Sequence, residues 1–513
     1  MQRSRAVRAL APVLALGLVA AACGGSDDGG SAEESATTEA ATGDTTMAEG
    51  TTMAEGTGDT MAEGTTMAEG TTMAEGTGDT TMSEGTGGGS GGGEYGGEPV
   101  DGVVQVGAGT EIDTAACPSD WSNTAGLEGP ITIGVSLPQS GQLAAFGAIG
   151  EGLTAYFDSI NETDPIDGKD VEFVLRDDAY DPARTQSNVE DMIETEDIGS
   201  FFSIIGTPNN AAVRPILDEE CIPQLYNSTG FPAWGDPANF PWTIGGLLPY
   251  NTEADIWCQH IVEELGEGAT VAGLFMNNDF GKVYQTSMES CEGIDLVESL
   301  THEATAADIS NELTTLASSG ADAFVLGSTA AFCPQAMAGV AQSPWDPLFL
   351  MSNTCSSISS FFTPVDPAGD GVRLVGYTKE VSDAAYAEDE GVVRARQILE
   401  DAGIDPDSGS APTGVIFALT LEQILREAAA LPGGLTRTNI MAATWNLDFT
   451  NELLRDGVNV KTDGVNDAYV AEGGYIVEYQ APEGEGNGQY DTVSELISVE
   501  GEPGSVSQPG GEG

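Results

Sequence analysis

Two polar loops hold the residues with the clearest chemical capacity. Gly206-Thr207-Pro208-Asn209-Asn210 and Asn227-Ser228-Thr229-Gly230 each follow a short apolar run that is typical of a buried strand. Their side chains form hydrogen bonds, and a loop that opens a helix also presents free backbone N–H groups, which attract an anion such as a carboxylate. Asn209 and the Ser228-Thr229 pair have an alternative role as helix caps. The pattern indicates binding of a small solute and not a chemical reaction.

The usual parts of a catalytic or metal site are missing from the sequence. Neither His260 nor His302 stands near a Ser or Cys that could act as a nucleophile, and no GxGxxG follows a strand. No CxxC pair occurs, and Asp456, Asn459 and Asp463 lack the spacing and the final Glu of a calcium loop. We therefore expect no enzymatic activity, no cofactor and no metal; an exported α/β enzyme is the alternative.

The chain is strongly acidic. It has 513 residues, with 82 Asp and Glu against 16 Lys and Arg, and its formal net charge is −66. Because nucleic acids are bound through Lys and Arg, this balance excludes a nucleic-acid partner. Residues 24–115 hold 19 of the acids and no base, but the rest of the chain is also acidic.

The first 23 residues have the pattern of an export signal. Arginines in residues 1–8 precede an apolar run, Ala9 to Val19, and then Ala20-Ala21-Ala22-Cys23. The apolar run is too short to span a membrane. The segment resembles a bacterial lipoprotein signal, which implies that residues 1–22 are removed and that a lipid on Cys23 anchors the protein to the cell membrane, outside the cytoplasm. An ordinary secretory signal is the alternative.

Residues 23–115 are expected to form a disordered, acidic linker. The segment is rich in Gly and Thr and lacks apolar mass, so it cannot form a packed core. Its Met-Ala-Glu-Gly repeats recur every six to nine residues, which is too short for a solenoid unit. They occur at 47–50, 53–56, 61–64, 67–70 and 73–76, with Met-Ser-Glu-Gly at 82–85.

The six cysteines that follow Cys23 are expected to form disulfides, because exported proteins fold in an oxidising compartment. Six cysteines allow 15 connectivities, and the sequence alone does not choose among them. The pairing that we favour is Cys117–Cys221, Cys258–Cys291 and Cys333–Cys355.

From about residue 130, apolar runs and helical segments alternate. This order predicts an α/β protein whose parallel sheets are covered by helices on both faces. Strands of a first series are predicted at 131–136, 171–176, 201–205 and 222–226, with helices at 148–160, 183–193 and 210–219. A second series has strands at 270–276, 294–299, 323–326, 348–351 and 372–377, and helices at 253–265, 282–291, 307–318 and 334–341. Helices at 390–402, 412–431 and 437–444 and a hairpin around 467–480 follow.

Between residues 130 and 480 the sequence resembles the periplasmic leucine/isoleucine/valine-binding proteins, which are the type I solute-binding proteins of ABC importers. The resemblance is carried by four segments in the same order as in that family. They are IGVSLPQSGQLAAFG, RDDAYDPARTQSNVEDMI, SIIGTPNNAAVRPILDEECIPQLYNSTG and GLFMNNDFGKVY.

The resemblance implies two Rossmann-like lobes joined by a hinge of three chain crossings, with the ligand held between them. Lobe 1 would comprise residues 127–247 and about 378–465, and lobe 2 residues 248–377 and about 466–482. Residues 483–513 would form a loose acidic tail. A monomer that passes its solute to the permease subunits of an ABC transporter is the implied function, with a ligand-sensing receptor as the alternative.

The resemblance also implies which residues contact the ligand. Positions on lobe 1 that correspond to the family's carboxylate site and aromatic wall are Asn209, Ser228, Thr229, Gly230 and Phe146. Those on lobe 2 are Phe280, Thr329 and Asn353.

Two of these positions differ from the family pattern. Asn353 stands where branched-chain binders have a glutamate for the amino group of the ligand, so Asp279 or a backbone carbonyl would have to replace it. Thr329 is smaller than the tyrosine that is common at its position. The expected ligand is therefore an amino acid or a related amide, urea or small carboxylate, including aromatic acids.

Overall fold

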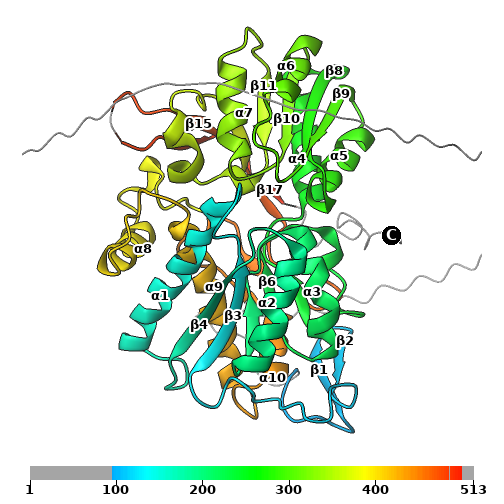
Figure 1. Cartoon of the computed structure of the whole chain (residues 1–513), viewed down its shortest axis with the longest axis vertical. Coiled ribbons are helices and arrows are strands. Elements are labelled where there is room, and N and C mark those ends of the chain that lie inside the picture. Colours follow the sequence, from blue (N-terminus) through cyan, green and yellow to red (C-terminus); the bar gives the residue numbers. More distant parts are fainter. Residues whose placement is uncertain (1–94, 485, 499–513) are drawn as a thin grey trace, which may run out of the picture. The chain divides into compact units, whose positions relative to one another are not determined.

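The computed structural model describes residues 95–484 and 486–498. The predicted signal peptide, Cys23 and most of the predicted linker lie outside the described residues. The described chain folds around two larger sheets, each accompanied by helices, as the alternation of strands and helices predicts (Figure 1).

Lobe 1 contains a parallel sheet with the strand order β4-β3-β5-β6-β7. All residues of β3 except Thr132 are buried, because the strand lies inside the sheet and is covered on both faces. The strands are β3 (Ile131–Leu137), β4 (Val171–Asp177), β5 (Ser200–Phe202), β6 (Gln224–Asn227) and β7 (Thr243–Gly245). The helices between them are α1 (Ile149–Thr163), α2 (Pro182–Thr195) and α3 (Thr207–Glu219).

Lobe 2 contains the larger sheet, with the order β16-β15-β12-β11-β10-β8-β9 and β17 paired to β15. β8 to β12 are parallel, whereas β15 is antiparallel to β12, β16 and β17. The parallel strands are β8 (Ala269–Met276), β9 (Ile294–His302), β10 (Ala323–Gly327), β11 (Leu348–Met351) and β12 (Arg373–Gly376). The antiparallel strands are β15 (Gly473–Gln480), β16 (Gln489–Thr492) and β17 (Ile497–Ser498). The helices are α4 (Tyr250–Leu265), α5 (Asp279–Ser290), α6 (Ser310–Ser319) and α7 (Phe332–Ala341).

The chain passes between the lobes three times, as predicted: after β7, after β12 and before β15. The second crossing brings α8 (Glu390–Asp401), α9 (Ala411–Ala430) and α10 (Arg437–Thr444) back to lobe 1, where α9 packs along α1 (Figure 1). Two glycines permit this close packing. A Cβ on Gly152 would stand 1.9 Å from the Ala411 carbonyl oxygen, and one on Gly414 would stand 2.1 Å from the Ile149 carbonyl oxygen. The start of α9 is thereby held near the start of α1.

Short 3₁₀ and π turns complete the fold. They are η1 (Ala144–Ala148), η2 (Pro232–Trp234), η3 (Asn353–Cys355), η4 (Ile358–Phe362), η5 (Thr363–Val365) and η6 (Ala384–Tyr386). A small antiparallel pair, β13 (Asp448–Phe449) and β14 (Val460–Lys461), lies in the segment before the third crossing.

Both predicted ends of the folded region were wrong. The linker was predicted to extend to residue 115, but β1 (Val103–Gly107) and β2 (Thr110–Asp113) form an antiparallel hairpin. It is ordered because Val104, Val106 and Ile112 are buried in the core. The tail was predicted to be loose from residue 483, but β16 and β17 both pair with β15 and extend the sheet of lobe 2.

Two further differences concern short or misassigned strands. The hairpin predicted at 467–480 is absent, because β15 finds its partners in β12, β16 and β17. β7 was missed, since three residues carry too little pattern to predict a strand.

The three favoured disulfides are present. Cys117–Cys221 links the segment before β3 to the end of α3, across a sequence separation of 104 positions. Cys258–Cys291 joins α4 to the end of α5, and Cys333–Cys355 joins the start of α7 to η3. Each therefore fastens elements within one lobe and leaves the crossings free. Among the described residues, no helix is both long and apolar enough to cross a membrane.

Candidate ligand-binding site

A cavity lies between the lobes, at the carboxyl ends of the strands of both sheets. Its volume is ≈ 90 Å³, which is room for several water molecules. Its wall is supplied mainly by segments that directly follow strands, because parallel strands all end at the same edge of a sheet. On lobe 1 these segments contribute Leu143, Phe146, Ile149, Tyr180, Ile205, Gly206, Thr207, Ser228 and Leu247. On lobe 2 they contribute Phe280, Thr329, Asn353, Thr354, Ser356, Ser357 and Phe361. The crossings and the helices next to them add Tyr250, Tyr377, Thr378, Glu380, Ser410, Thr413, Ile416 and Phe417.

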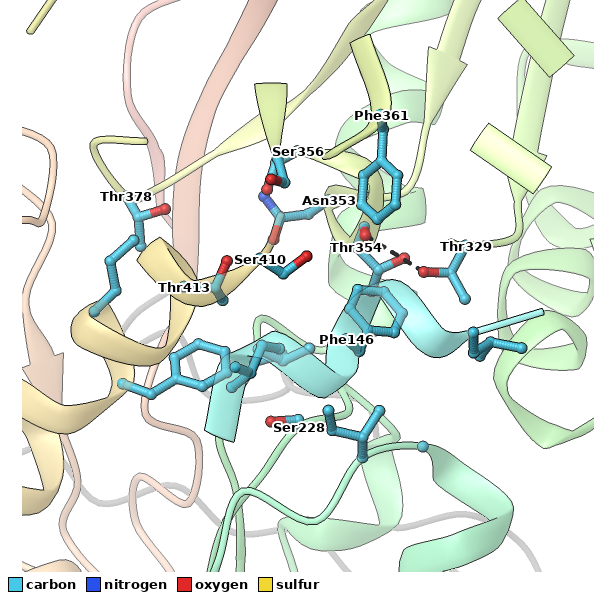
Figure 2. A pocket seen from close by; sticks show the side chains of 18 of the residues that line it. Phe146, Ser228, Thr329, Asn353, Thr354, Ser356, Phe361, Thr378, Ser410 and Thr413 are labelled. Carbon is cyan, nitrogen blue, oxygen red and sulfur yellow. Dashed lines mark hydrogen bonds between the residues drawn. The ribbon is translucent and has the colours of Figure 1, made fainter. Parts of the chain in front are cut away.

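Two aromatic rings from opposite lobes meet over the cavity. Phe146 comes from η1 of lobe 1 and Phe361 from η4 of lobe 2, and Figure 2 shows them pointing toward each other. Their centroids are 5.9 Å apart, with an edge-to-face angle of 76°, which is a favourable arrangement for two rings. They form an aromatic wall to which both lobes contribute.

Five of the eight predicted contact residues line this cavity. They are Phe146, Ser228, Phe280, Thr329 and Asn353. The sequence places these residues on separate segments, and the fold brings them together because each follows the carboxyl end of a strand. The motifs shared with the family therefore identified residues of the cavity wall on both lobes.

The polar members of this group are held by neighbouring groups. Ser228 Oγ is 2.5 Å from Ser203 Oγ. Asn353 Nδ2 donates to the Val375 carbonyl oxygen at 2.6 Å, which commits the amide nitrogen to the neighbouring strand. Thr329 Oγ1 donates to the Thr354 carbonyl oxygen at 3.3 Å (Figure 2). The cavity therefore presents hydroxyl and amide oxygens in fixed positions.

The other three predicted residues lie behind the wall of the cavity. Asn209 Nδ2 donates to Thr185 Oγ1 at 2.7 Å, so this amide joins α3 to α2. Thr229 Oγ1 and Thr207 Oγ1 share a hydrogen bond of 2.6 Å. The Gly230 carbonyl oxygen accepts from the N–H of Tyr250 at 2.8 Å. These groups support the loops that form the wall.

Sequence reasoning missed several residues of the wall, in two ways. Tyr180 lies in a motif that was recognised, and Glu380 follows the predicted strand at 372–377, so both could have been found by extending the strand-end rule to every strand. Ser410 and Thr413 reach the cavity from the start of α9, and Phe361 from a π turn. No local pattern marks them, because the crossings of the chain bring them there.

The cavity wall contains an acidic side chain and no basic one. Glu380 is the carboxylate among its residues, and none of the residues that line it is Lys, Arg or His. Glu380 is 5% exposed. Burial raises the pKa of its carboxyl group to about 7, although a hydrogen bond from Ser382 favours the ionised form. Burial also raises the pKa of Tyr180 and Tyr250 above the ordinary value, so both phenols are neutral hydrogen-bonding groups.

Further contacts between the lobes surround the cavity. Ser360 Oγ and Ser410 Oγ share a hydrogen bond of 2.9 Å, and Ser359 Oγ donates to the Gly409 carbonyl oxygen at 2.9 Å. On another side, Tyr180 of lobe 1 and Asn278 of lobe 2 are close enough that the Asn278 side chain acts to lower the pKa of the Tyr180 phenol. The lobes are thus closed on each other, and the arrangement can enclose a solute.

The described part of the chain contains few groups that could catalyse a reaction of that solute. Within residues 95–484 and 486–498, no three His, Cys, Asp or Glu side chains are grouped so that they could hold a metal ion. Both histidines are occupied elsewhere: His260 Nε2 is 2.8 Å from Arg373 Nη1, and His302 Nε2 is 2.8 Å from Ser328 Oγ.

Solved structures with this fold cover most of the described chain. A fatty acid ABC transporter substrate-binding protein from Thermomonospora curvata is 18% identical, with a TM-score of 0.61, over 75% of this chain and 96% of the other. A branched chain amino acid ABC transporter protein from Thermus thermophilus with bound valine is 18% identical, with a TM-score of 0.62, over 72% and 98%. A solute-binding protein from R. palustris in complex with 4-hydroxybenzoate is 17% identical, with a TM-score of 0.59, over 72% and 96%. At these identities the likeness concerns the fold.

The sequence itself identifies the family. Among curated proteins, none is significantly similar in sequence. The sequence pattern described as "periplasmic binding protein" matches residues 130–481, which is more than half of the chain and includes most of both lobes and every residue that lines the cavity. The chain therefore belongs to the periplasmic binding protein family.

Proposed function

We propose that this protein is the extracytoplasmic substrate-binding protein of an ABC transporter, and that it captures a small solute between its lobes and delivers it to a membrane permease. The single observation that carries the proposal is the cavity, because it lies between two lobes that three chain crossings connect and is lined by both. A solute that contacts both walls stabilises the closed state over the open one, which is the coupling that delivery requires.

The wall of the cavity supports a solute with an apolar body and one polar end. Phe146, Phe361, Phe280 and Phe417 offer aromatic surface, and hydroxyl groups such as that of Ser228 offer hydrogen bonds. An amino acid or a related small amide or carboxylate has this character. Of the three solved structures named above, one holds valine, one holds 4-hydroxybenzoate and one is a fatty acid transporter protein, which supports the same general class.

The lipid on Cys23 and the acidic tether that follows it belong to this proposal as predictions from the sequence. Anchoring would keep the protein at the outer face of the membrane, near its permease. Metabolic labelling with a fatty acid, compared between the wild type and Cys23→Ser, tests the anchor. Equal labelling of the two proteins contradicts it.

Thermal-shift screening of the full chain tests the binding function. The panel contains amino acids, amides, ureas, aromatic acids, fatty acids and amines. At least one compound is expected to raise the melting temperature by several degrees, because a ligand that binds only the folded form stabilises it. Ser228→Ala is expected to reduce this shift while the free protein stays folded, although loss of the hydrogen bond to Ser203 lowers its melting temperature somewhat. If no compound raises the melting temperature and some ester or amide is hydrolysed, the protein is an enzyme.

Delivery to a permease is tested separately from binding. The solute-loaded protein is expected to stimulate the ATPase activity of its reconstituted transporter, whereas the free protein stimulates it less. If the loaded protein leaves every permease unaffected but activates a sensor kinase, the same clamp serves in signalling.

A further inference from the structure

Glu380 is a buried carboxylate that faces the cavity without a cationic partner. It follows β12, and Ser382 Oγ donates to its Oε1 at 3.0 Å. Within the described residues, no Lys, Arg or His nitrogen lies within 4 Å of it. Of the nearby bases, Lys379 Nζ is 2.7 Å from Asp389 Oδ2, and Arg455 donates its Nε to the Thr378 carbonyl oxygen at 3.1 Å. Arg455 Nη2 lies 3.9 Å from Asp383 Oδ2, which is beyond hydrogen-bond distance.

An ionised carboxylate in this environment is destabilised, because it has lost its hydration without gaining a cationic partner. Buried charges in proteins are ordinarily paired or fully hydrogen-bonded, because removal from water costs several kcal/mol. The free energy of burial raises the pKa of Glu380 to about 7. The titratable groups that face it are Asp383, whose pKa burial raises to about 6, and Tyr490, whose pKa is raised as well. Neither group supplies a positive charge, so a cation that enters the cavity would stabilise the ionised carboxylate of Glu380.

The other groups of the wall suit a cation with an apolar body. Hydroxyl oxygens of Thr378, Ser410, Thr413 and Ser356 gather on the side of the cavity away from Thr329, and such oxygens accept hydrogen bonds from an ammonium group (Figure 2). Aromatic faces attract cations as well as apolar groups. The strongly negative charge of the whole chain acts in the same direction.

The opposite assignment, an anion at the N-terminus of α3, has weaker support. Gly206 and Thr207 line the cavity there. However, Pro208 has no N–H to donate, and the N–H of Asn210 donates to the Gly206 carbonyl oxygen at 3.0 Å. A solute with a carboxylate as its only polar group would also meet Glu380 and no base on the cavity wall.

We infer that the solute is an amphipathic amine, and that Glu380 is the counter-ion of its ammonium group. The inference rests on the proposed function, because it names the chemical class of the solute bound in that same cavity. It also explains why the family's glutamate can be replaced by Asn353: the acidic group is supplied from another strand end, 27 positions further along the chain.

A matched set of probes tests the inference. Benzyl, isobutyl and n-hexyl frameworks are each offered as the amine, the alcohol and the carboxylate, at about pH 8, where Glu380 is mostly ionised. Melting temperatures and dissociation constants are measured for the full chain, for Glu380→Gln and for Glu388→Gln. Glu388 is exposed, lies in the same crossing and does not line the cavity, so its variant controls for the loss of one negative charge.

The expected result is that amines bind the wild type and Glu388→Gln more tightly than the matching alcohols and carboxylates do. Glu380→Gln is expected to lose at least ~10-fold in amine affinity, since a charge-assisted bond becomes a neutral one, while the alcohols bind as before. Preference for the carboxylates in the wild type overturns the inference and leaves the proposed function standing. Amine binding that is equal in wild type and Glu380→Gln overturns the role of Glu380. If neither these probes nor the wider panel binds, the proposed function fails, and the inference fails with it.

Discussion

Glu253 is expected to make the stability of this protein depend strongly on pH. It lies on α4, is 1% exposed, and joins three elements. Its Oε2 accepts from the Tyr284 hydroxyl at 2.5 Å, and its Oε1 accepts from the N–H of Asn353 at 2.6 Å. Despite these hydrogen bonds, burial raises the pKa of the carboxyl group from 4.5 to about 8. The folded protein therefore holds the neutral acid at a pH where the unfolded chain has released the proton.

The sign and size of the effect follow from proton linkage. Between pH 4.5 and about 8, the folded state binds more protons at this site than the unfolded state does. The free energy of unfolding contributed by Glu253 is therefore fully present below pH 4.5, falls as the pH rises through this window, and is constant above about pH 8. At 1.36 kcal/mol for each pKa unit, the total fall is about 5 kcal/mol.

Glu253→Gln isolates this contribution. The glutamine oxygen can still accept from the N–H of Asn353, and the Tyr284 hydroxyl can donate instead to Ser352 Oγ, which is 2.9 Å away. Urea unfolding of the two proteins at several pH values gives the difference in their unfolding free energies. We expect that difference to change by about 5 kcal/mol between pH 4.5 and 8. The exposed Glu289→Gln is the control, and titration of other groups cancels in the difference. Parallel stability curves for wild type and Glu253→Gln would refute the reasoning.

Three other outcomes follow from the same structure. Phe146→Ala and Phe361→Ala should each weaken solute binding about tenfold, since each removes one side of the aromatic wall; calorimetric titration measures this, and unchanged affinity in both places the solute elsewhere. The double variant Cys117→Ser/Cys221→Ser should lose about 3–5 kcal/mol of unfolding free energy, because a long loop is no longer closed; an unchanged urea midpoint contradicts this. Affinity for benzylamine should fall toward tenfold per pH unit below about pH 7, as protonation of Glu380 removes the counter-ion, and equal affinity at pH 6 and 8 would exclude that role.

Most of the fold was predictable from local pattern. Mostly apolar runs such as 131–136 identify strands that are buried on both faces, and their alternation with helices determines a parallel α/β arrangement. The ends of the folded region were not predictable in this way. Residues 103–113 and 489–498 lie next to Gly- and acid-rich sequence, and they are ordered because a core or a strand edge is present to receive them.

The residues of the candidate site were likewise predictable only in part. Phe146 and Ser228 follow strands in recognisable motifs, so their position on the cavity wall could be predicted from the order of the elements. Asn209 was expected there on the same argument, yet its side chain turns to Thr185. The motif specifies where the backbone runs, whereas the neighbouring helix determines where the side chain points.

By itself, the sequence determined the acidity, the export signal pattern, the α/β class and the family, because each depends on composition or on short-range order along the chain. Only the tertiary structure decided that Glu380, Phe361 and Ser410 meet Phe146 around one cavity. These residues are separated by more than 200 positions from Phe146, and it is the crossings between the lobes that bring them together. The charge and shape offered to a solute are thus properties of the closed pair of lobes and of no single segment.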